Sequence, residues 1–193
     1  MAVDDGEKMG VFCNSFSNDY NGGMQPDLSL SQEIGVLLRE KGLFLVTAES
    51  CSGGLLGHLI TSVAGSSDYY LGGVVAYSNL AKRSWLHVQA TTLQQFGAVS
   101  QETVLEMVAG ARAALGANTP VAMVIGLAIS GIAGPGGGTP QKPVGNVWIG
   151  LGSARGQEAH MYQFSGDRLA VMQQAAHAAL GLLKAHLRRA RLA

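Results

Sequence analysis

The feature that most restricts the fold is an unbroken apolar segment, VAMVIGLAI, at residues 121–129. Its length suits a β-strand, and it shows no alternation between apolar and polar residues. A strand with apolar side chains on both faces is typical of the centre of a sheet that is covered on both sides. The segment therefore predicts a central strand with helices on both faces of its sheet.

Segments of strand length alternate with segments of helical periodicity along most of the chain. Strands are predicted at residues 43–47, 72–77, 121–129, 146–151 and 160–164. Helices are predicted from Ser29 or Ser31 to Gly42, at about 53–64, from Asn79 through Trp85, at 91–96, from Ser100 through Leu115, and from Asp167 through Leu187. This order predicts an α/β fold, a three-layer α/β/α sandwich with a mostly parallel central sheet. The short 152–157 connection predicts a hairpin, which gives the sheet one antiparallel strand.

Composition excludes several classes of protein. The 193 residues are 47% hydrophobic and 13% charged, and the formal net charge is zero. A neutral chain lacks the basic excess that supplies much of the affinity for nucleic acid. No apolar run reaches the ~20 residues of a membrane span, and the first residues have no secretory-signal pattern. We expect a cytoplasmic protein with neither nucleic-acid nor membrane partners.

The composition of residues 1–27 bears on the domain organisation, and the small number of cysteines bears on disulfides and metal sites. Residues 1–27 show no periodicity and are rich in Asp, Asn, Ser and Gly, so we expect a tail outside the fold and a single domain at 28–193. Cys13 and Cys51 are too few for a disulfide framework, and no CxxC pair suggests a metal site.

The segment TAESCSGG, residues 47–54, lies where a predicted strand meets a predicted helix. α/β folds bind their ligands at the carboxyl ends of strands. Gly53 and Gly54 allow the main chain to approach a substrate, and amides at the start of a helix can hold an oxyanion or a phosphate. The plainer interpretation is that Ser50 or Ser52 caps the helix, but one serine suffices for a cap.

A glycine- and proline-rich segment, GIAGPGGGTPQKPVG, occupies residues 131–145 between two predicted strands. Its composition predicts a shaped loop whose exposed amides hold an anion or surround a flat ligand. The alternative is a long disordered loop. The segment is not a P-loop, because it lacks the Lys-Ser/Thr pair and precedes a strand instead of a helix.

Lys82, in the segment AYSNLAKR, lies one turn into a predicted short helix, after a strand that ends at Tyr77. A lysine can act as a general base if its pKa falls from ~10.4 to about 7, which burial and nearby cations can cause. The alternative is an ordinary solvent-exposed lysine. None of the five histidines has a carboxylate at a partnering spacing, so none is predicted as the base. Cys51 is a rival nucleophile, or a small buried hydrophobe.

Together these segments resemble the CinA C-terminal domain family, whose stand-alone members are nicotinamide-nucleotide amidases. The resemblance extends over about residues 29–187, and no part of residues 1–27 matches it. Ser52 stands where the family usually has threonine, which keeps the hydroxyl. The segments that carry the resemblance are TAESCSGG, AGSSDYYLGGVVAYSNLAK, FGAVS, SGIAGPGGGTPQKPVGNVWIGL and FSGDR.

The resemblance implies a serine amidohydrolase that converts nicotinamide mononucleotide to nicotinic acid mononucleotide and ammonia, with no metal and no cofactor. Ser50 is the implied nucleophile and Lys82 its implied partner. Lys142 and Arg168 are the candidate cations for the phosphate, and Arg168 opens a helix, where a cation opposes the helix dipole. The residues implied to bind the substrate are Glu49, Ser52, Gly53, Gly54, Tyr77, Ser130, Gly131, Gly134, Gly136, Gly137, Lys142 and Arg168. We also expect a homo-oligomer.

Two other functions stay open on the sequence alone. The first is a catalytically silent nucleotide-binding module, which needs the glycines but no neutral lysine. The hydrolase requires Ser50 and Lys82 to come within hydrogen-bond distance, whereas the binding module does not. The second is a cysteine amidase that uses Cys51, and it lacks a plausible histidine base.

Overall fold

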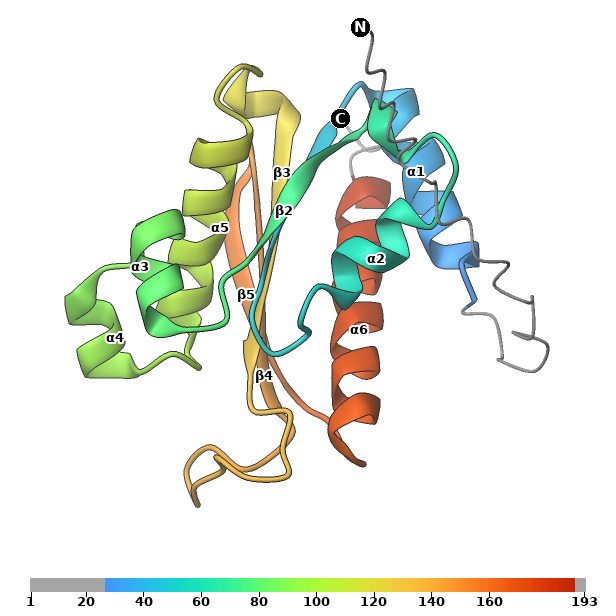
Figure 1. The fold of residues 1–193 in the computed structure, drawn as a ribbon. Coiled ribbons are helices and arrows are strands. Elements are labelled where there is room, and N and C mark those ends of the chain that lie inside the picture. Colours follow the sequence, from blue (N-terminus) through green and yellow to red (C-terminus); the bar gives the residue numbers. More distant parts are fainter. Residues whose placement is uncertain (1–26, 190–193) are drawn as a thin grey trace, which may run out of the picture.

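The structure is a computed structural model, and it describes residues 27–189. The tail expected at residues 1–27 lies outside the described residues, except for Asp27. Five strands form one mixed sheet in the order β2-β1-β3-β4-β5 (Figure 1). β1, β2 and β3 are mutually parallel, and β4 is antiparallel to both of its neighbours, as predicted. The strands are β1 (Phe44–Glu49), β2 (Tyr70–Val75), β3 (Val124–Gly131), β4 (Asn146–Ser153) and β5 (Gly156–Gln163).

Three helices lie on each side of the sheet (Figure 1), which confirms the predicted α/β/α layers. One side carries α1 (Ser29–Lys41), α2 (Leu55–Thr61) and α6 (Arg168–Arg189). The other side carries α3 (Asn79–Leu86), α4 (Ala90–Phe96) and α5 (Gln101–Leu115). Short 3-10 turns occur at Ser66–Asp68 and Val121–Met123. None of the helices in the described residues has the length and apolar character needed to cross a bilayer.

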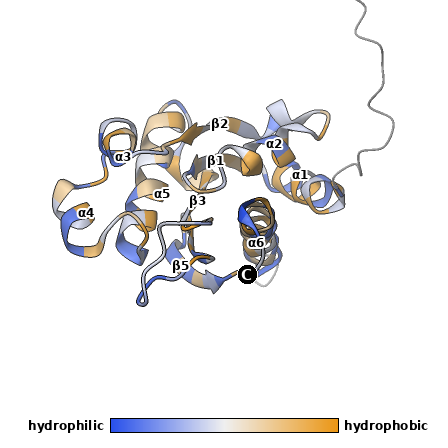
Figure 2. Cartoon of the chain, turned by 60° about the horizontal axis from the view of Figure 1, so that its bottom comes forward, coloured by the Kyte–Doolittle hydropathy of each residue, from blue (hydrophilic) through white to orange (hydrophobic). Residues whose placement is uncertain are grey.

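The central strand β3 separates two hydrophobic cores. Every residue of β3 from Val124 to Ser130 is buried, as the unbroken apolar segment predicts. One core packs between the sheet and α1, α2 and α6, and the other packs between the sheet and α3 and α5. Figure 2 shows hydrophobic colour on β1 and β2 and hydrophilic colour on β5, the strand at the opposite edge. Burial on both faces explains why β3 lacks the alternation of a half-exposed strand.

The ends of the elements differ from prediction in a few places. Neither predicted serine caps α1, because Ser31 is buried inside the helix and the Asp27 carboxylate accepts from the Ser29 N–H at 2.9 Å. The residue that caps α3 is Ser78 and not Asn79. Strand β3 begins at Val124, since the three preceding residues form a 3-10 turn. The predicted caps of α5 and α6 and the stop of α1 at Gly42 are confirmed.

The topology brings three connections to one edge of the sheet. β1, β2 and β3 run in parallel, so their carboxyl ends meet there. The bend after Glu49, the residues after Val75 and the loop after Gly131 therefore lie together, although they are far apart in the sequence. This edge is where open α/β sheets bind ligands.

Gly110 sets how closely α5 approaches the end of α3. A Cβ added at Gly110 would lie 2.0 Å from the Leu86 carbonyl oxygen, a distance that backbone atoms do not tolerate. We expect Gly110→Ala to lower the free energy of unfolding by about 1–3 kcal/mol in urea titrations, because the two helices must separate. Gly181→Ala in α6 is the matched control, since nothing lies within 4 Å of its added Cβ. Alanine favours a helix by up to ~1 kcal/mol, so a Gly110→Ala protein as stable as the control would contradict the close contact.

Candidate active site

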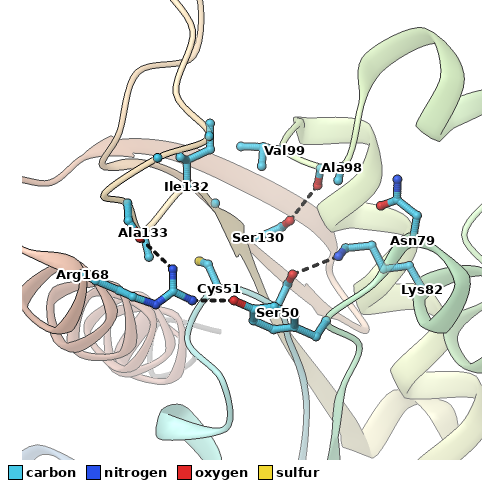
Figure 3. Close-up of a pocket in the computed structure, with 15 residues that line it drawn as sticks. Ser50, Cys51, Asn79, Lys82, Ala98, Val99, Ser130, Ile132, Ala133 and Arg168 are labelled. Atoms are coloured by element: carbon cyan, nitrogen blue, oxygen red, sulfur yellow. Dashed lines mark hydrogen bonds between the residues drawn. The ribbon is translucent and has the colours of Figure 1, made fainter.

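A pocket of about 280 Å³ opens at this edge of the sheet (Figure 3). Its walls come from the bend after β1, the segment after β2, the residues before α5, the loop after β3 and the first residue of α6. The lining residues are Ser50, Cys51, Tyr77, Asn79, Lys82, Ala98, Val99, Ser130, Gly131, Ile132, Ala133, Gly134, Gly136, Gly137 and Arg168. Nine of the fourteen residues expected at the site line it, both Ser50 and Lys82 among them.

Ser50 and Lys82 point toward each other in the pocket (Figure 3). The Ser50 Oγ and the Lys82 Nζ are 2.9 Å apart, and both side chains are buried. The Lys82 Nζ also donates to the Ala76 carbonyl oxygen at 3.0 Å. Ser78 caps α3 and so places Lys82 in the first turn of that helix, beside the end of β1. The interpretation of Lys82 as a solvent-exposed lysine is therefore wrong, because only 1% of it is exposed.

The surroundings of Lys82 favour the neutral amine. Burial lowers the pKa of Lys82 below its ordinary value, and the nearby Cys51 opposes this to a smaller extent. No carboxylate among the described residues forms a hydrogen bond or an ion pair with the Lys82 ammonium group. The main cause of the shift is therefore desolvation of the charged form.

Cys51 lines the pocket but has the properties of a buried apolar residue. It is 5% exposed and belongs to the core on the α6 side of the sheet. Burial raises the pKa of its thiol to about 12, so the reactive thiolate is disfavoured. No histidine lines the pocket in the part of the chain that the structure describes. These observations weigh against a cysteine nucleophile.

Glu49, Ser52, Gly53 and Gly54 do not line the pocket, although a substrate contact was expected of each. The Glu49 carboxylate is 2% exposed and binds main-chain N–H groups at the start of α2. Ser52 is fully buried, and its hydroxyl has no hydrogen-bond partner in the structure. Gly53 and Gly54 have φ of 65° and 100°, a left-handed backbone that glycine adopts without strain. This part of the motif shapes the bend that carries Ser50.

The loop after β3 is tied to the segment before α5 near both of its ends. Ser130, at the end of β3, donates its hydroxyl hydrogen to the Ala98 carbonyl oxygen at 2.6 Å. Lys142 does not reach the pocket, because its Nζ donates to the Phe96 and Val99 carbonyl oxygens at 2.7 and 2.6 Å. Lys142 thus ties the loop to the segment before α5, and its ammonium group is bound to main-chain oxygens instead of lining the pocket.

Arg168 joins the two sides of the pocket mouth. Its Nη1 donates to the Gly134 carbonyl oxygen at 2.8 Å, and its Nη2 donates to the Tyr77 hydroxyl oxygen (Figure 3). Arg168 is the first residue of α6 and is exposed, so its guanidinium remains within reach of a ligand. Of the two cations considered from the sequence, Arg168 is the one in the pocket wall.

Five lining residues were not foreseen as site residues. Four are apolar and form the wall between the loop and α5, and the fifth is Asn79 at the start of α3. The motif FGAVS contains two of the four, but apolar side chains carry no chemical signal that separates a pocket wall from a core. The four apolar residues are Ala98, Val99, Ile132 and Ala133.

The described residues hold no group of three or more His, Cys, Asp or Glu side chains placed to bind a metal ion. The chemistry available in the pocket is that of a hydroxyl, an amine, a guanidinium, a phenol and main-chain amides.

Comparisons with known proteins identify the family of the chain. Residues 27–187 match the family model of the CinA C-terminal domain. The chain is 49% identical over 148 residues to the nicotinamide-nucleotide amidohydrolase PncC of Enterobacter agglomerans. This match covers 76% of this chain and 87% of that protein. It is 45% identical over 154 residues to a CinA-like protein of Salinibacter ruber, covering 80% of this chain but only 36% of that longer protein.

Solved structures of competence/damage-inducible proteins have a fold similar to that of this chain. The competence damage-inducible protein A from Klebsiella pneumoniae has a TM-score of 0.78 and 37% identity, and the match covers 86% of this chain and 98% of that one. A competence/damage inducible protein from Agrobacterium tumefaciens has a TM-score of 0.76 and 37% identity, with 83% and 94% coverage. The match to the family model and these relatives show that the chain belongs to the CinA C-terminal domain family.

Proposed function

We propose that the protein hydrolyses the carboxamide of nicotinamide mononucleotide to give nicotinic acid mononucleotide and ammonia, a step that recycles pyridine nucleotides toward NAD. The observation that carries the proposal is the 2.9 Å contact between the Ser50 Oγ and the buried Lys82 Nζ. The name of the Enterobacter agglomerans relative supports this choice of substrate.

The proposed reaction begins with proton transfer from Ser50 to Lys82. One hydrogen of the Lys82 amine donates to the Ala76 carbonyl oxygen, and in the neutral amine the lone pair can accept the hydrogen of the Ser50 hydroxyl. As Lys82 takes the hydroxyl proton, the Ser50 Oγ attacks the carboxamide carbon and forms a tetrahedral intermediate.

The same amine then serves the two later steps. The Lys82 ammonium protonates the departing nitrogen, ammonia leaves, and a nicotinoyl ester remains on Ser50. A water molecule gives a proton to the neutral Lys82 and attacks this ester. Collapse of the second intermediate releases the carboxylic acid, and Lys82 returns the proton to Ser50.

The pocket wall suits the two ends of this substrate. The apolar side chains of Val99 and Ile132 offer a surface for the pyridine ring. Arg168 and the glycine-rich loop offer a cation and main-chain amides for the phosphate. A silent binding module would need these features but would not need a buried amine beside a hydroxyl, so the hydrolase explains more of the site. A homo-oligomeric state, a cytoplasmic location and the 28–193 domain boundary stay predictions.

The first prediction concerns the nucleophile and its base. Ser50→Ala, Lys82→Ala and Lys82→Arg should each reduce ammonia release from nicotinamide mononucleotide by at least about 1,000-fold, since the two residues act as a unit. Arginine fails because its guanidinium stays protonated and cannot accept a proton. The double variant should be about as slow as either single variant. Substrate binding by Ser50→Ala, followed by calorimetry, should be largely retained.

Cys51→Ala is the control for this series, and it should keep most of the activity because the thiol is buried and protonated. Full activity in Ser50→Ala together with loss in Cys51→Ala would replace the serine mechanism with a thiol mechanism. An unaltered protein that binds the nucleotide but releases no ammonia would support the silent module.

The second prediction concerns pH. The pKa of Lys82 is lower in the folded protein than its ordinary value of 10.5, so the unfolded chain binds more protons in the window between the two values. Stability contributed through Lys82 therefore rises with pH across that window. Relative to Lys82→Met, the unaltered protein should gain free energy of unfolding as the pH rises toward the ordinary lysine pKa of 10.5, measured by urea titration. A difference that falls with rising pH would contradict the lowered pKa.

The third prediction concerns Arg168. Arg168→Ala should raise the KM for the nucleotide at least about tenfold and change kcat less, because it removes a charged contact that is made before and during the reaction. Lys142→Ala is the comparison, since Lys142 does not line the pocket and its Nζ donates to the Phe96 and Val99 carbonyl oxygens. A KM in Arg168→Ala equal to that of the unaltered enzyme would remove Arg168 from phosphate binding.

A further inference from the structure

Glu49 precedes the nucleophile, yet its side chain points away from the pocket and into the start of α2. Its Oε2 accepts from the Gly54 and Leu56 N–H groups at 3.0 Å each, and its Oε1 accepts from the Gly57 N–H at 2.8 Å. The carboxylate is 2% exposed. One buried side chain thus satisfies three of the amides that a helix start leaves without intrahelical partners.

The other N–H groups of the bend are used by main-chain oxygens. The Ser50 N–H donates to the Ile129 carbonyl oxygen at 2.9 Å, the Gly53 N–H to the Ser50 carbonyl oxygen at 3.0 Å, and the Leu55 N–H to the Ser52 carbonyl oxygen at 3.2 Å. Within the fully described segment 50–57, only the Cys51 and Ser52 N–H groups have no acceptor on another residue.

Of these two residues only Cys51 lines the pocket, since Ser52 is completely buried. The Cys51 N–H is therefore the one unpaired amide of the bend that belongs to a pocket-lining residue. An N–H of the residue after the nucleophile is a common oxyanion donor in α/β hydrolases. An amide donor of this kind stabilises the charge that develops on the substrate oxygen.

We propose that Glu49 is a positioning residue of the nucleophile bend. Its carboxylate holds the first turn of α2, and this fixes the bend so that the Ser50 Oγ faces Lys82 and the Cys51 N–H faces the substrate carbonyl. The inference rests on the proposed function, because it takes Ser50 as the nucleophile. It also replaces the expected contact between Glu49 and the substrate.

A second layer of contacts keeps the carboxylate in place. The Tyr70 hydroxyl and the Thr47 Oγ1 are 2.6 Å apart on the same side of the sheet. A Cβ at Gly57 would lie 3.1 Å from the Tyr70 hydroxyl oxygen and 3.4 Å from the Glu49 Oε1. The phenol and the carboxylate therefore pack against the same glycine, which leaves little room for the carboxylate to shift.

Because Glu49 binds the N–H groups at the start of α2, these groups are not available to bind the phosphate of a substrate. A helix N-terminus binds anions through its unpaired N–H groups. Here Glu49 occupies the Gly54, Leu56 and Gly57 N–H groups. The phosphate end of the substrate must therefore be held elsewhere in the pocket, which agrees with the place of Arg168.

The test compares Glu49→Gln with Arg112→Met. Glutamine keeps the size of the side chain, but its NH2 group cannot accept from an N–H, so at least one amide loses its partner. We expect kcat for the nucleotide to fall at least about tenfold, with KM changed less than about threefold, since a small misplacement of reacting groups is costly. Labelling of Ser50 by a small fluorophosphonate should slow by a similar factor.

Arg112→Met is the matched control for loss of a polar side chain that binds main-chain groups. The Arg112 Nε and Nη2 donate to the Val124 and Val121 carbonyl oxygens at 3.0 and 2.8 Å, at the opposite end of β3 from the pocket. This variant should lower Tm while kcat and the labelling rate stay unchanged. If Glu49→Gln does not fold, Glu49→Asp replaces it, because the shorter carboxylate keeps the charge and reaches fewer amides. It should show a smaller loss of kcat and labelling.

The outcomes separate this inference from the substrate assignment. If Ser50 of the unaltered protein is labelled but nicotinamide mononucleotide is not hydrolysed, the proposed function fails and the labelling rates still decide the role of Glu49. A folded Glu49 variant with unaltered kcat and labelling rate would overturn the inference. Absence of Ser50 labelling in the unaltered protein would overturn both.

Discussion

The site depends on a primary amine buried beside a hydroxyl. Lys82 is 1% exposed, and its Nζ contacts the Ser50 hydroxyl and the Ala76 carbonyl oxygen. A buried ammonium without a carboxylate partner is strongly disfavoured, whereas a neutral amine can satisfy one oxygen as donor and accept from a hydroxyl. Among the described residues no carboxylate bonds to this amine, so the fold buries it without a counter-charge.

Much of the fold could be predicted because its signals are local. The apolar run of β3, the glycine stop of α1 and the serine cap of α5 each act through neighbouring residues. The cap of α1 was misassigned because Ser31 has the right chemistry for a cap, but the helix starts earlier and turns this residue toward the core. Side-chain type alone does not fix the phase of a helix.

The sequence predicted that Ser50 and Lys82 lie in one pocket, but it did not predict what Lys142 and Glu49 contact. Lys82 and Lys142 each lie next to one polar residue in the sequence, and only tertiary packing buries the first and ties the second to the Phe96 and Val99 carbonyl oxygens. The resemblance to a family, and not the spacing, distinguished them. The role of Glu49 was equally hidden, because its partners are amides that become available only when Gly53 and Gly54 take left-handed conformations.

The short segment from Ala76 to Lys82, which connects β2 to α3, supplies several of the polar contacts in and around the pocket. Ala76 supplies the carbonyl that orients the amine, and Tyr77 supplies the phenol that meets Arg168. Ser78 caps α3, and the helix then carries Lys82 back toward the sheet. The helix cap places the amine beside the Ser50 hydroxyl, and the carbonyl oxygen accepts one of its hydrogen bonds. The proposed proton transfer from Ser50 to Lys82 depends on this placement, and a single strand-to-helix connection supplies it.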